Sequence, residues 1–114
     1  MNILVVGGAG YIGSHFVKLM ASYGFNVTVL DNLSTGHADS VLKAKLVIGN
    51  VGDCKLVDEL LKKEDFDTVF HFAANSVVGE SVSNPSKYYR NNVSETLNLL
   101  DLMVKHGVKK FVFS

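Results

Sequence analysis

A glycine-rich stretch separates a short apolar run from an amphipathic run near the start of this chain. The apolar run, residues 3–6, predicts a buried strand, and the amphipathic run predicts a helix. Gly7, Gly10 and Gly13 occupy the turn in a G-x-x-G-x-x-G pattern. A helix that begins here presents unpaired N–H groups and its positive end, and glycines let a phosphate approach the backbone. The stretch therefore predicts a pyrophosphate site; the alternative is a turn that needs glycine for steric reasons alone.

An acidic residue ends the next apolar run. Residues 27–30 predict a second strand, and Asp31 follows it, about 20 residues after the glycines. A carboxylate at that point of a dinucleotide-binding fold can accept both ribose hydroxyls of an adenosine, and it repels a 2′-phosphate. No arginine follows Asp31 in the loop to pair with such a phosphate. We therefore expect NAD, and not NADP, as the cofactor; a plain turn aspartate is the alternative.

The remaining patterns predict the order β-α-β-β-α-β-α-β, with no repeat and no linker. Strands that are apolar on both faces and alternate with helices indicate a parallel sheet covered by helices on both sides. Right-handed crossovers then give the strand order 3-2-1-4-5. We predict an α/β fold, a Rossmann-type doubly wound sheet of five strands, in which residues 1–114 form one NAD-binding domain.

Helical spacing also predicts which side chains each helix buries. For the first helix, which Gly24 would end, the expected stripe is Ile12, Phe16, Leu19, Met20 and Tyr23. For the second, with Asp53 as its N-cap, the expected face is Leu56, Val57, Leu60 and Leu61. For the third, which would begin with Asn84 as cap and Pro85 and end at Gly107, the expected stripe is Tyr89, Val93, Leu97, Leu100 and Val104.

In a sheet of this order the ligand lies across the carboxyl ends of the strands, where the strand order reverses. The segments that follow the first four strands therefore line the expected site: residues 7–13, 31–36, 49–53 and 72–76. Asn50 can accept a hydrogen bond from an adenine amino group; a simple loop asparagine is an equal alternative. We interpret His71, at the end of the fourth strand, as a buried imidazole hydrogen-bonded to the backbone.

Composition excludes several other functions. Lys and Arg number 11 against 11 Asp and Glu, so no basic excess favours a nucleic acid or an anionic membrane surface. No apolar run reaches the length of a membrane span. We expect no leader before the first strand, because the chain shows no basic segment and no cleavage site there. Cys54 is the only cysteine, which fits a reducing cytoplasm, and the histidines lack metal-ligand spacing. Tyr88 and Tyr89 lack a lysine four residues later, so we assign no catalytic residue. Because of the histidine spacing, we also assign no metal ligand.

Several motifs resemble the UDP-glucose 4-epimerases, a family of the extended branch of the short-chain dehydrogenases/reductases. They are residues 7–15, 31–37 and 71–74, Val78-Gly79-Glu80-Ser81 before Pro85, and Tyr88-Tyr89 with Asn91-Asn92-Val93. The resemblance covers residues 7–114 and corresponds to the N-terminal third of such an enzyme. The family's catalytic Ser or Thr, its Tyr-x-x-x-Lys pair and its substrate domain would lie beyond Ser114.

The resemblance implies NAD as cofactor and a set of cofactor-binding residues in the loops. The expected set is Gly7, Gly10, Tyr11, Ile12, Gly13, Asp31, Asn32, Leu33, Ser34, Thr35, Gly36, Asn50, Val51, Phe72, Ala73, Ala74, Asn75, Ser76 and Asn91. Tyr11 and Ile12 would meet the pyrophosphate, and Asn50 and Val51 would flank the adenine. Some epimerases carry lysine where Ser76 stands, and a hydroxyl cannot supply that charge.

For the parent protein, the resemblance implies interconversion of UDP-glucose and UDP-galactose, by transient hydride transfer to NAD at sugar C4. Its substrate would be a UDP-hexose, and we expect the parent protein to be a cytoplasmic homodimer. We expect the 114 residues on their own to be inactive. The alternatives are another sugar-nucleotide enzyme of the same branch, such as a 4,6-dehydratase, and a non-catalytic NAD-binding module. The apolar residues 111–113 disfavour a module that ends here, because natural proteins usually cover such an edge strand.

Overall fold

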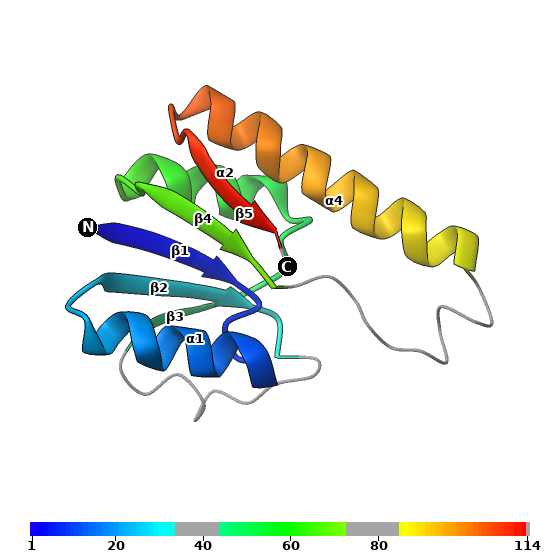
Figure 1. The fold of residues 1–114 in the computed structure, drawn as a ribbon. Helices are drawn as coiled ribbons and strands as arrows, with labels where there is room; N and C mark the ends of the chain where they lie inside the picture. Colours follow the sequence, from blue (N-terminus) through cyan, green and yellow to red (C-terminus); the bar gives the residue numbers. More distant parts are fainter. Residues whose placement is uncertain (34–43, 73–84, 114) are drawn as a thin grey trace.

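The computed structural model describes residues 1–33, 44–72 and 85–113, with the backbone alone for 85–92. Its elements, in chain order, are β1 (Asn2–Val6), α1 (Tyr11–Ser22), β2 (Asn26–Asp31), β3 (Lys45–Ile48), α2 (Cys54–Lys63), β4 (Thr68–His71), α4 (Pro85–Lys105) and β5 (Lys110–Phe113). Across these described ranges, the order of strands and helices confirms the prediction from sequence (Figure 1).

The strands form a five-stranded parallel sheet in the order β3-β2-β1-β4-β5, as predicted. The central strand β1 pairs with β2 and β4, and its last residue, Val6, lies opposite both Leu30 and His71. The strand order therefore reverses at β1. The carboxyl ends of β1, β2 and β4 consequently meet at one edge of the sheet.

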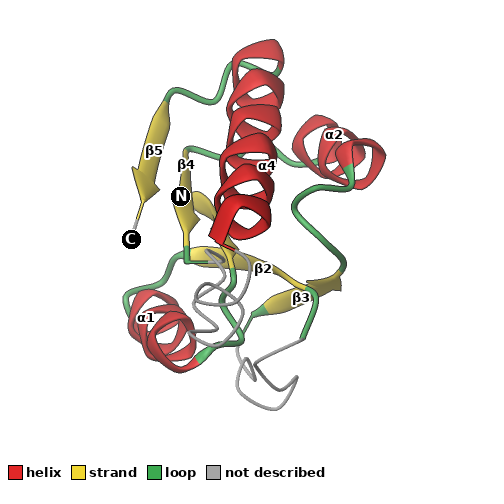
Figure 2. Ribbon diagram, turned by 90° about the vertical axis from the view of Figure 1, so that its right-hand side faces the viewer, coloured by secondary structure: helices red, strands yellow, loops and turns green. Residues whose placement is uncertain are grey.

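Alternate residues of the central strands face two separate hydrophobic clusters. Leu4 and Val6 belong to a cluster with the apolar residues of α2 and α4, whereas Ile3 and Val5 belong to a cluster with α1. Figure 2 shows the corresponding layers, with α1 on one side of the sheet and α2 and α4 on the other. This alternation explains why the strands are apolar along their whole length: both faces of the sheet are buried.

The predicted helix ends are confirmed where the structure describes them. Gly24 and Gly107 follow α1 and α4 with φ angles of 86° and 74°, the left-handed conformation that glycine adopts without strain. The Asp53 side chain accepts a hydrogen bond from the Leu56 N–H at 3.2 Å, an N-cap that contributes about 1 kcal/mol. Pro85 is the first residue of α4, and Asn84 lies outside the described residues.

The predicted apolar stripe of α1 is only partly correct. Gly13 and Val17 are the buried residues of this helix, and Phe16 and Met20 pack at the edge of the cluster. The remaining members of the stripe are exposed: Ile12, Leu19 and Tyr23. The reason is the close approach of α1 to the glycine turn, because a Cβ atom at Gly13 would collide with the Gly7 carbonyl oxygen. The face with the smallest residues therefore turns inward.

For α4, the structure overturns most of the predicted stripe. Val93, Leu97 and Val104 are exposed, whereas Leu99 and Met103 are buried and Leu100 packs beside them. The Tyr89 side chain lies outside the described residues. Helix α4 carries two apolar stripes, and contact with α2 as well as with the sheet selects the one through Leu99 and Met103. The predicted face of α2 is confirmed, with Leu56 at its margin.

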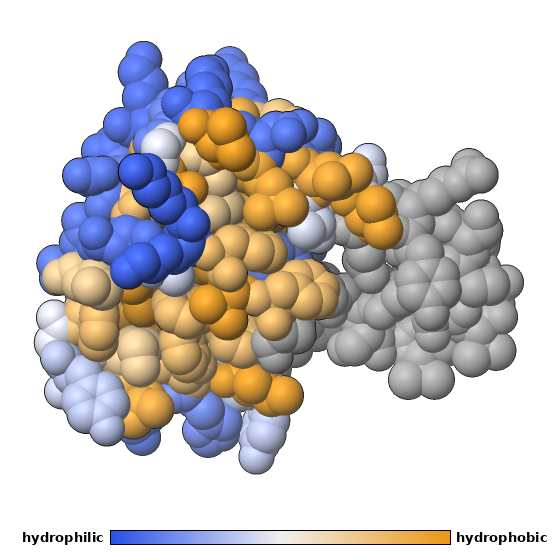
Figure 3. Space-filling view, turned by 45° about the horizontal axis from the view of Figure 1, so that its top comes forward, coloured by the Kyte–Doolittle hydropathy of each residue, from blue (hydrophilic) through white to orange (hydrophobic). Residues whose placement is uncertain are grey.

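Exposed apolar side chains gather where α4 and β5 reach the surface. On β5, Val112 and Phe113 are 46% and 58% exposed, and on α4 Val93 and Leu97 are similarly uncovered. Figure 3 shows apolar residues together on this face. Strand β5 is also an edge of the sheet, so its outer N–H and C=O groups have no neighbouring strand in the described structure. None of the described helices is long and apolar enough to cross a membrane.

An ionic cluster joins α2 to the end of α4. One carboxylate oxygen of Asp58 accepts hydrogen bonds from Lys105 Nζ at 2.9 Å and from His106 Nε2 at 2.7 Å. The hydrogen bonds from His106 and Lys105 lower the pKa of Asp58 below its ordinary value. A carboxyl whose pKa is depressed by folding stabilises the folded state above its unfolded pKa, and this stabilisation is lost as the pH falls through the folded pKa.

We therefore expect Asp58→Asn to lower the melting temperature at pH 7, with the difference from wild type shrinking as the pH falls below about 4. Thermal unfolding followed by circular dichroism at several pH values is the measurement. Asp101→Asn is the control, because Asp101 is an exposed carboxylate of α4, the helix whose Lys105 binds Asp58. A difference that stays constant down to acid pH would contradict the role given to the Asp58 charge.

Candidate functional site

The glycine turn after β1 is held tightly against the strands beneath it. Gly7 has a φ angle of 83°, and its N–H donates to the Leu30 carbonyl at 2.8 Å. A Cβ atom at Gly8 would lie 2.8 Å from Val29 Cγ1 and 3.0 Å from Val17 Cγ2. Gly8 therefore allows α1 to pack closely against β2, because a side chain at this position would collide with both elements. The sequence pattern missed this residue because it falls outside the repeat of Gly7, Gly10 and Gly13.

The N-terminus of α1 lies at the carboxyl end of the sheet, and no side chain of its own first turn caps it. Its N-cap residue, Gly10, offers no side chain to cap it, and the first turn contains no acidic residue. Tyr11 and Ile12 are 82% and 66% exposed, so the first turn is open to a ligand. The free N–H groups and positive dipole end of such a turn favour an anion. The geometry therefore agrees with a phosphate site.

The carboxylate of Asp31 links the glycine turn after β1 to the loop after β2. Its Oδ2 accepts a hydrogen bond from the Ala9 N–H at 3.0 Å, and its Oδ1 accepts one from the Leu33 N–H at 2.7 Å. Leu33 has a φ angle of 62°, which is costly for a branched side chain and is held here by that hydrogen bond. A carboxylate can accept about four hydrogen bonds, so Asp31 retains acceptor capacity toward a ligand.

The loop after β3 joins the same group of contacts. Asn50 Oδ1 accepts a hydrogen bond from Asn32 Nδ2 at 2.7 Å, and the Asp53 N–H closes a turn onto the Asn50 carbonyl at 3.0 Å. The Gly49 N–H donates to the Asp31 carbonyl at 3.0 Å, which continues the pairing of β2 with β3. Val51 is buried in the α2–α4 cluster and anchors the loop. Asn50 thus has a polar partner inside the protein, which the sequence did not indicate.

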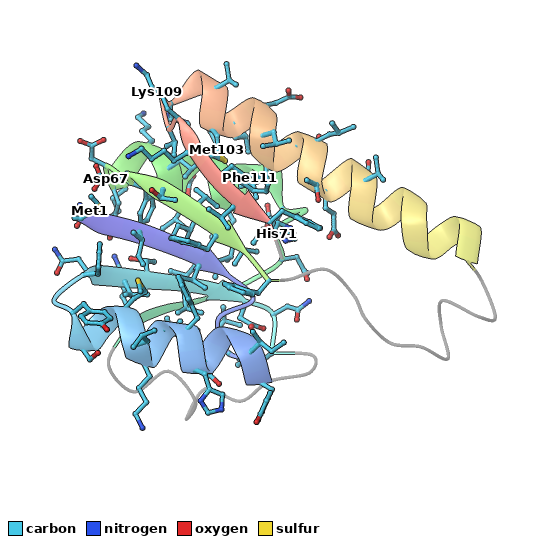
Figure 4. All side chains as sticks on the ribbon, in the orientation of Figure 1. Met1, Asp67, His71, Met103, Lys109 and Phe111 are labelled. Atoms are coloured by element: carbon cyan, nitrogen blue, oxygen red, sulfur yellow. The ribbon has the colours of Figure 1, made fainter. Side chains whose placement is uncertain are left out.

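His71 is buried, as predicted, but its expected hydrogen bond to the backbone is absent from the described structure. The residue is 3% exposed, and both ring nitrogens lack a hydrogen-bond partner among the described residues. Its ring lies 5.2 Å from that of Phe113 and 6.1 Å from that of Phe111, centroid to centroid. Figure 4 shows His71 at the end of β4, beside β5. Burial lowers the pKa of His71, which favours the neutral imidazole.

The described members of the predicted site meet at the carboxyl edge of the sheet. Residues 7–13 and 31–33 touch through Asp31, and Asn50 joins them through Asn32. The Phe72 N–H donates to the Val6 carbonyl at 2.6 Å, which places Phe72 beside the end of β1. Seven predicted residues lie outside the described ranges: Ser34, Thr35, Gly36, Ala73, Ala74, Asn75 and Ser76. Asn91 lies in α4, and its side chain is outside the described structure.

Metal-binding clusters are absent from the part of the chain that the structure describes: no three His, Cys, Asp or Glu residues there could hold an ion. Cys54, the first residue of α2, is exposed. Among the described residues, the polar groups that meet at this edge of the sheet include backbone N–H groups, the Asp31 carboxylate and the amides of Asn32 and Asn50. These groups suit a ligand that carries phosphates and hydroxyls.

Comparison with known proteins gives a consistent result. Residues 3–114 match the model of the NAD dependent epimerase/dehydratase family. The chain is 52% identical to a UDP-glucose 4-epimerase of Halalkalibacterium halodurans over 114 residues, which is all of this chain and 34% of that protein. It is 47% identical to one of Corynebacterium glutamicum, over 100% of this chain and 34% of that protein. The chain thus spans about a third of the length of these curated relatives.

Solved structures agree with the sequence relatives. A UDP-glucose 4-epimerase from Brucella ovis in complex with NAD superposes with a TM-score of 0.92 at 47% identity, covering 98% of this chain and 34% of that one. A UDP-glucose 4-epimerase from Bifidobacterium longum in complex with NAD+ and UDP gives a TM-score of 0.91 at 36% identity, with coverages of 100% and 36%. The family match, the shared fold and the open glycine turn together identify the chain as a member of the NAD dependent epimerase/dehydratase family.

Proposed function

We propose that residues 1–114 are the NAD-binding, N-terminal part of a UDP-glucose 4-epimerase, and that the substrate domain belongs to the remainder of the parent protein. One observation carries the proposal most directly. The uncapped N-terminus of α1 lies next to Asp31, which is joined to the glycine turn through the Ala9 N–H. An anion site and a ribose-binding carboxylate in this relation are what the diphosphate and adenosine ribose of NAD require. The relatives named above support the choice of reaction.

The proposal assigns a role to each loop at the sheet edge. Gly7, Gly10, Tyr11, Ile12 and Gly13 surround the pyrophosphate. The segment from Asp31, comprising Asn32, Leu33, Ser34, Thr35 and Gly36, binds the adenosine ribose and its surroundings. Asn50 and Val51 flank the adenine, and Phe72, Ala73, Ala74, Asn75 and Ser76 lie toward the nicotinamide ribose. Asn91 approaches the cofactor from α4.

The described residues act by binding and orientation. They would hold NAD, which would supply a reversible hydride acceptor for C4 of the sugar. The backbone N–H groups of the first turn of α1 hold the diphosphate, and Asp31 orients the ribose. The acid–base groups and the UDP-hexose site belong, in this proposal, to the rest of the protein. We further propose a homodimer in the cytoplasm, consistent with the lone, exposed Cys54 and the uncovered apolar face of α4.

A first prediction concerns the choice between NAD and NADP. NADP should bind at least about 100-fold more weakly than NAD, because the Asp31 carboxylate repels its 2′-phosphate. Asp31→Asn should narrow that gap, since the amide keeps an acceptor oxygen and removes the charge. Isothermal titration of the cofactor-free protein with both dinucleotides is the measurement. Equal affinity for NAD and NADP in the wild type would remove Asp31 from this role.

A second prediction distinguishes loss of phosphate binding from loss of the fold. A Cβ atom at Gly10 would meet only the Gly7 carbonyl oxygen, at 3.6 Å, so Gly10→Val should fold. Its branched side chain would nevertheless stand in front of the α1 N-terminus and abolish NAD binding. Gly13→Val is the contrasting variant, because its Cβ would collide with that oxygen and damage the fold itself. Circular dichroism and titration with NAD distinguish the two effects. Normal NAD binding by Gly10→Val would show that the phosphate lies elsewhere.

A third prediction concerns activity. The full-length protein should interconvert UDP-glucose and UDP-galactose, whereas the 114-residue chain alone should convert neither, because its sequence contains no Tyr-x-x-x-Lys pair. The isolated chain should also associate through the open β5 edge, and light scattering should give a mass above 12.4 kDa. Turnover by a monomer of the isolated chain would mean that one of its own residues is the acid–base group.

A further inference from the structure

Helix α4 contacts the loop after β3 through Glu95, whose side chain packs against Gly52. A Cβ atom at Gly52 would lie 3.0 Å from Glu95 Oε1 and 3.1 Å from Glu95 Cγ, so the two residues are in close contact. Glu95 is partly buried, and this burial raises the pKa of its carboxyl. No cation pairs with Glu95 among the described residues. Within the described residues, the Glu95 side chain therefore contacts the loop by packing against Gly52 and not through an ion pair.

Gly52 belongs to the turn that presents Asn50. The Asp53 N–H donates to the Asn50 carbonyl at 3.0 Å, so Gly52 lies within the closed turn. Asn50 in turn accepts from Asn32 at 2.7 Å, and the neighbouring Asp31 accepts from Ala9 in the glycine turn at 3.0 Å. An unbroken series of contacts thus runs from α4, through Glu95 and Gly52, to the loops of the cofactor site.

We propose that Glu95 is a positioning residue for the cofactor, through which α4 holds residues 49–53 in place for the adenine end. This inference rests on the proposed function, because it takes Asn50 as an adenine contact. Glu95 does not need to touch the cofactor. It limits the movement of a loop whose other side is open to solvent, where Asp53 and Cys54 are exposed.

The contact is local and is not what attaches α4 to the molecule. Leu99 and Met103 bury the helix in the core, and Asp58 binds Lys105 and His106 at its far end. Loss of the Glu95 side chain should therefore leave α4 docked and release only the loop. Any side chain at position 52 should push against Glu95, and removal of Glu95 should make room for it.

The test is a double-mutant cycle on NAD binding by the full-length protein, with Gly52→Ala, Glu95→Ala and the double variant. We expect each single variant to weaken NAD binding, and the double variant to bind more tightly than the sum of the two effects predicts, by at least about three-fold. Glu95→Gln keeps the shape of the side chain and should bind NAD like the wild type. Glu59→Ala, an exposed glutamate of α2, is the control and should change nothing.

A second ligand distinguishes a loss of loop positioning at the adenine end from a general loosening of the whole cofactor site. Nicotinamide mononucleotide lacks the adenosine, so Glu95→Ala should bind it like the wild type while losing affinity for NAD. Additive effects in the cycle, a Glu95→Gln variant as weak as Glu95→Ala, or equal losses for both ligands would overturn the inference. If the wild type itself fails to bind NAD, the proposed function fails instead. Circular dichroism confirms that each variant is folded, and the two Glu95 variants add no bulk that could prevent folding.

Discussion

The hydrogen bonds accepted by Asp31 are the interaction on which the whole site depends. Strands β1 and β2 end side by side, and each continues into a loop that could take many conformations. One carboxylate at the end of β2 fixes both, through the Ala9 N–H on one side and the Leu33 N–H on the other. The second of these hydrogen bonds also holds Leu33 in a backbone conformation that it would otherwise avoid. Asp31 therefore shapes the protein around the site as well as offering charge to a ligand.

The fold could be predicted from the sequence because its signals act over short distances. The glycine turn, the apolar strands and the capping residues Asp53 and Gly24 each depend on a few neighbours in the chain. Right-handed crossovers then leave little choice of strand order. The apolar faces of α1 and α4 were predicted less well. Leu19 and Leu97 fit a helical stripe as well as Val17 and Leu99 do, and only packing against other elements decides which stripe is buried.

The site was predictable in outline and less so in its partners. The loops that meet at the carboxyl edge follow from strand order, and the described ones lie there. The sequence did not indicate that Asn50 binds Asn32, nor that Gly8 packs between helix and sheet, because both depend on residues distant in the chain. For His71, a buried imidazole was correctly predicted, but the hydrogen bond expected for it is not formed within the described residues. The neighbouring strand β5 places the rings of Phe111 and Phe113 there, and an aromatic ring offers the imidazole no ordinary acceptor.

The close packing of Gly8 against Val17 and Val29 has a consequence for the energetics of binding. Because Gly8 lies between Val17 and Val29, the turn that would hold a diphosphate is part of the hydrophobic core and not a separate surface loop. Such a turn is already ordered in the folded chain, so a ligand does not have to supply the conformational entropy of ordering it. The first turn of α1 is therefore preorganised. This preorganisation ties affinity to the integrity of the core: mutations that loosen Val17 or Val29 would weaken binding without touching the ligand.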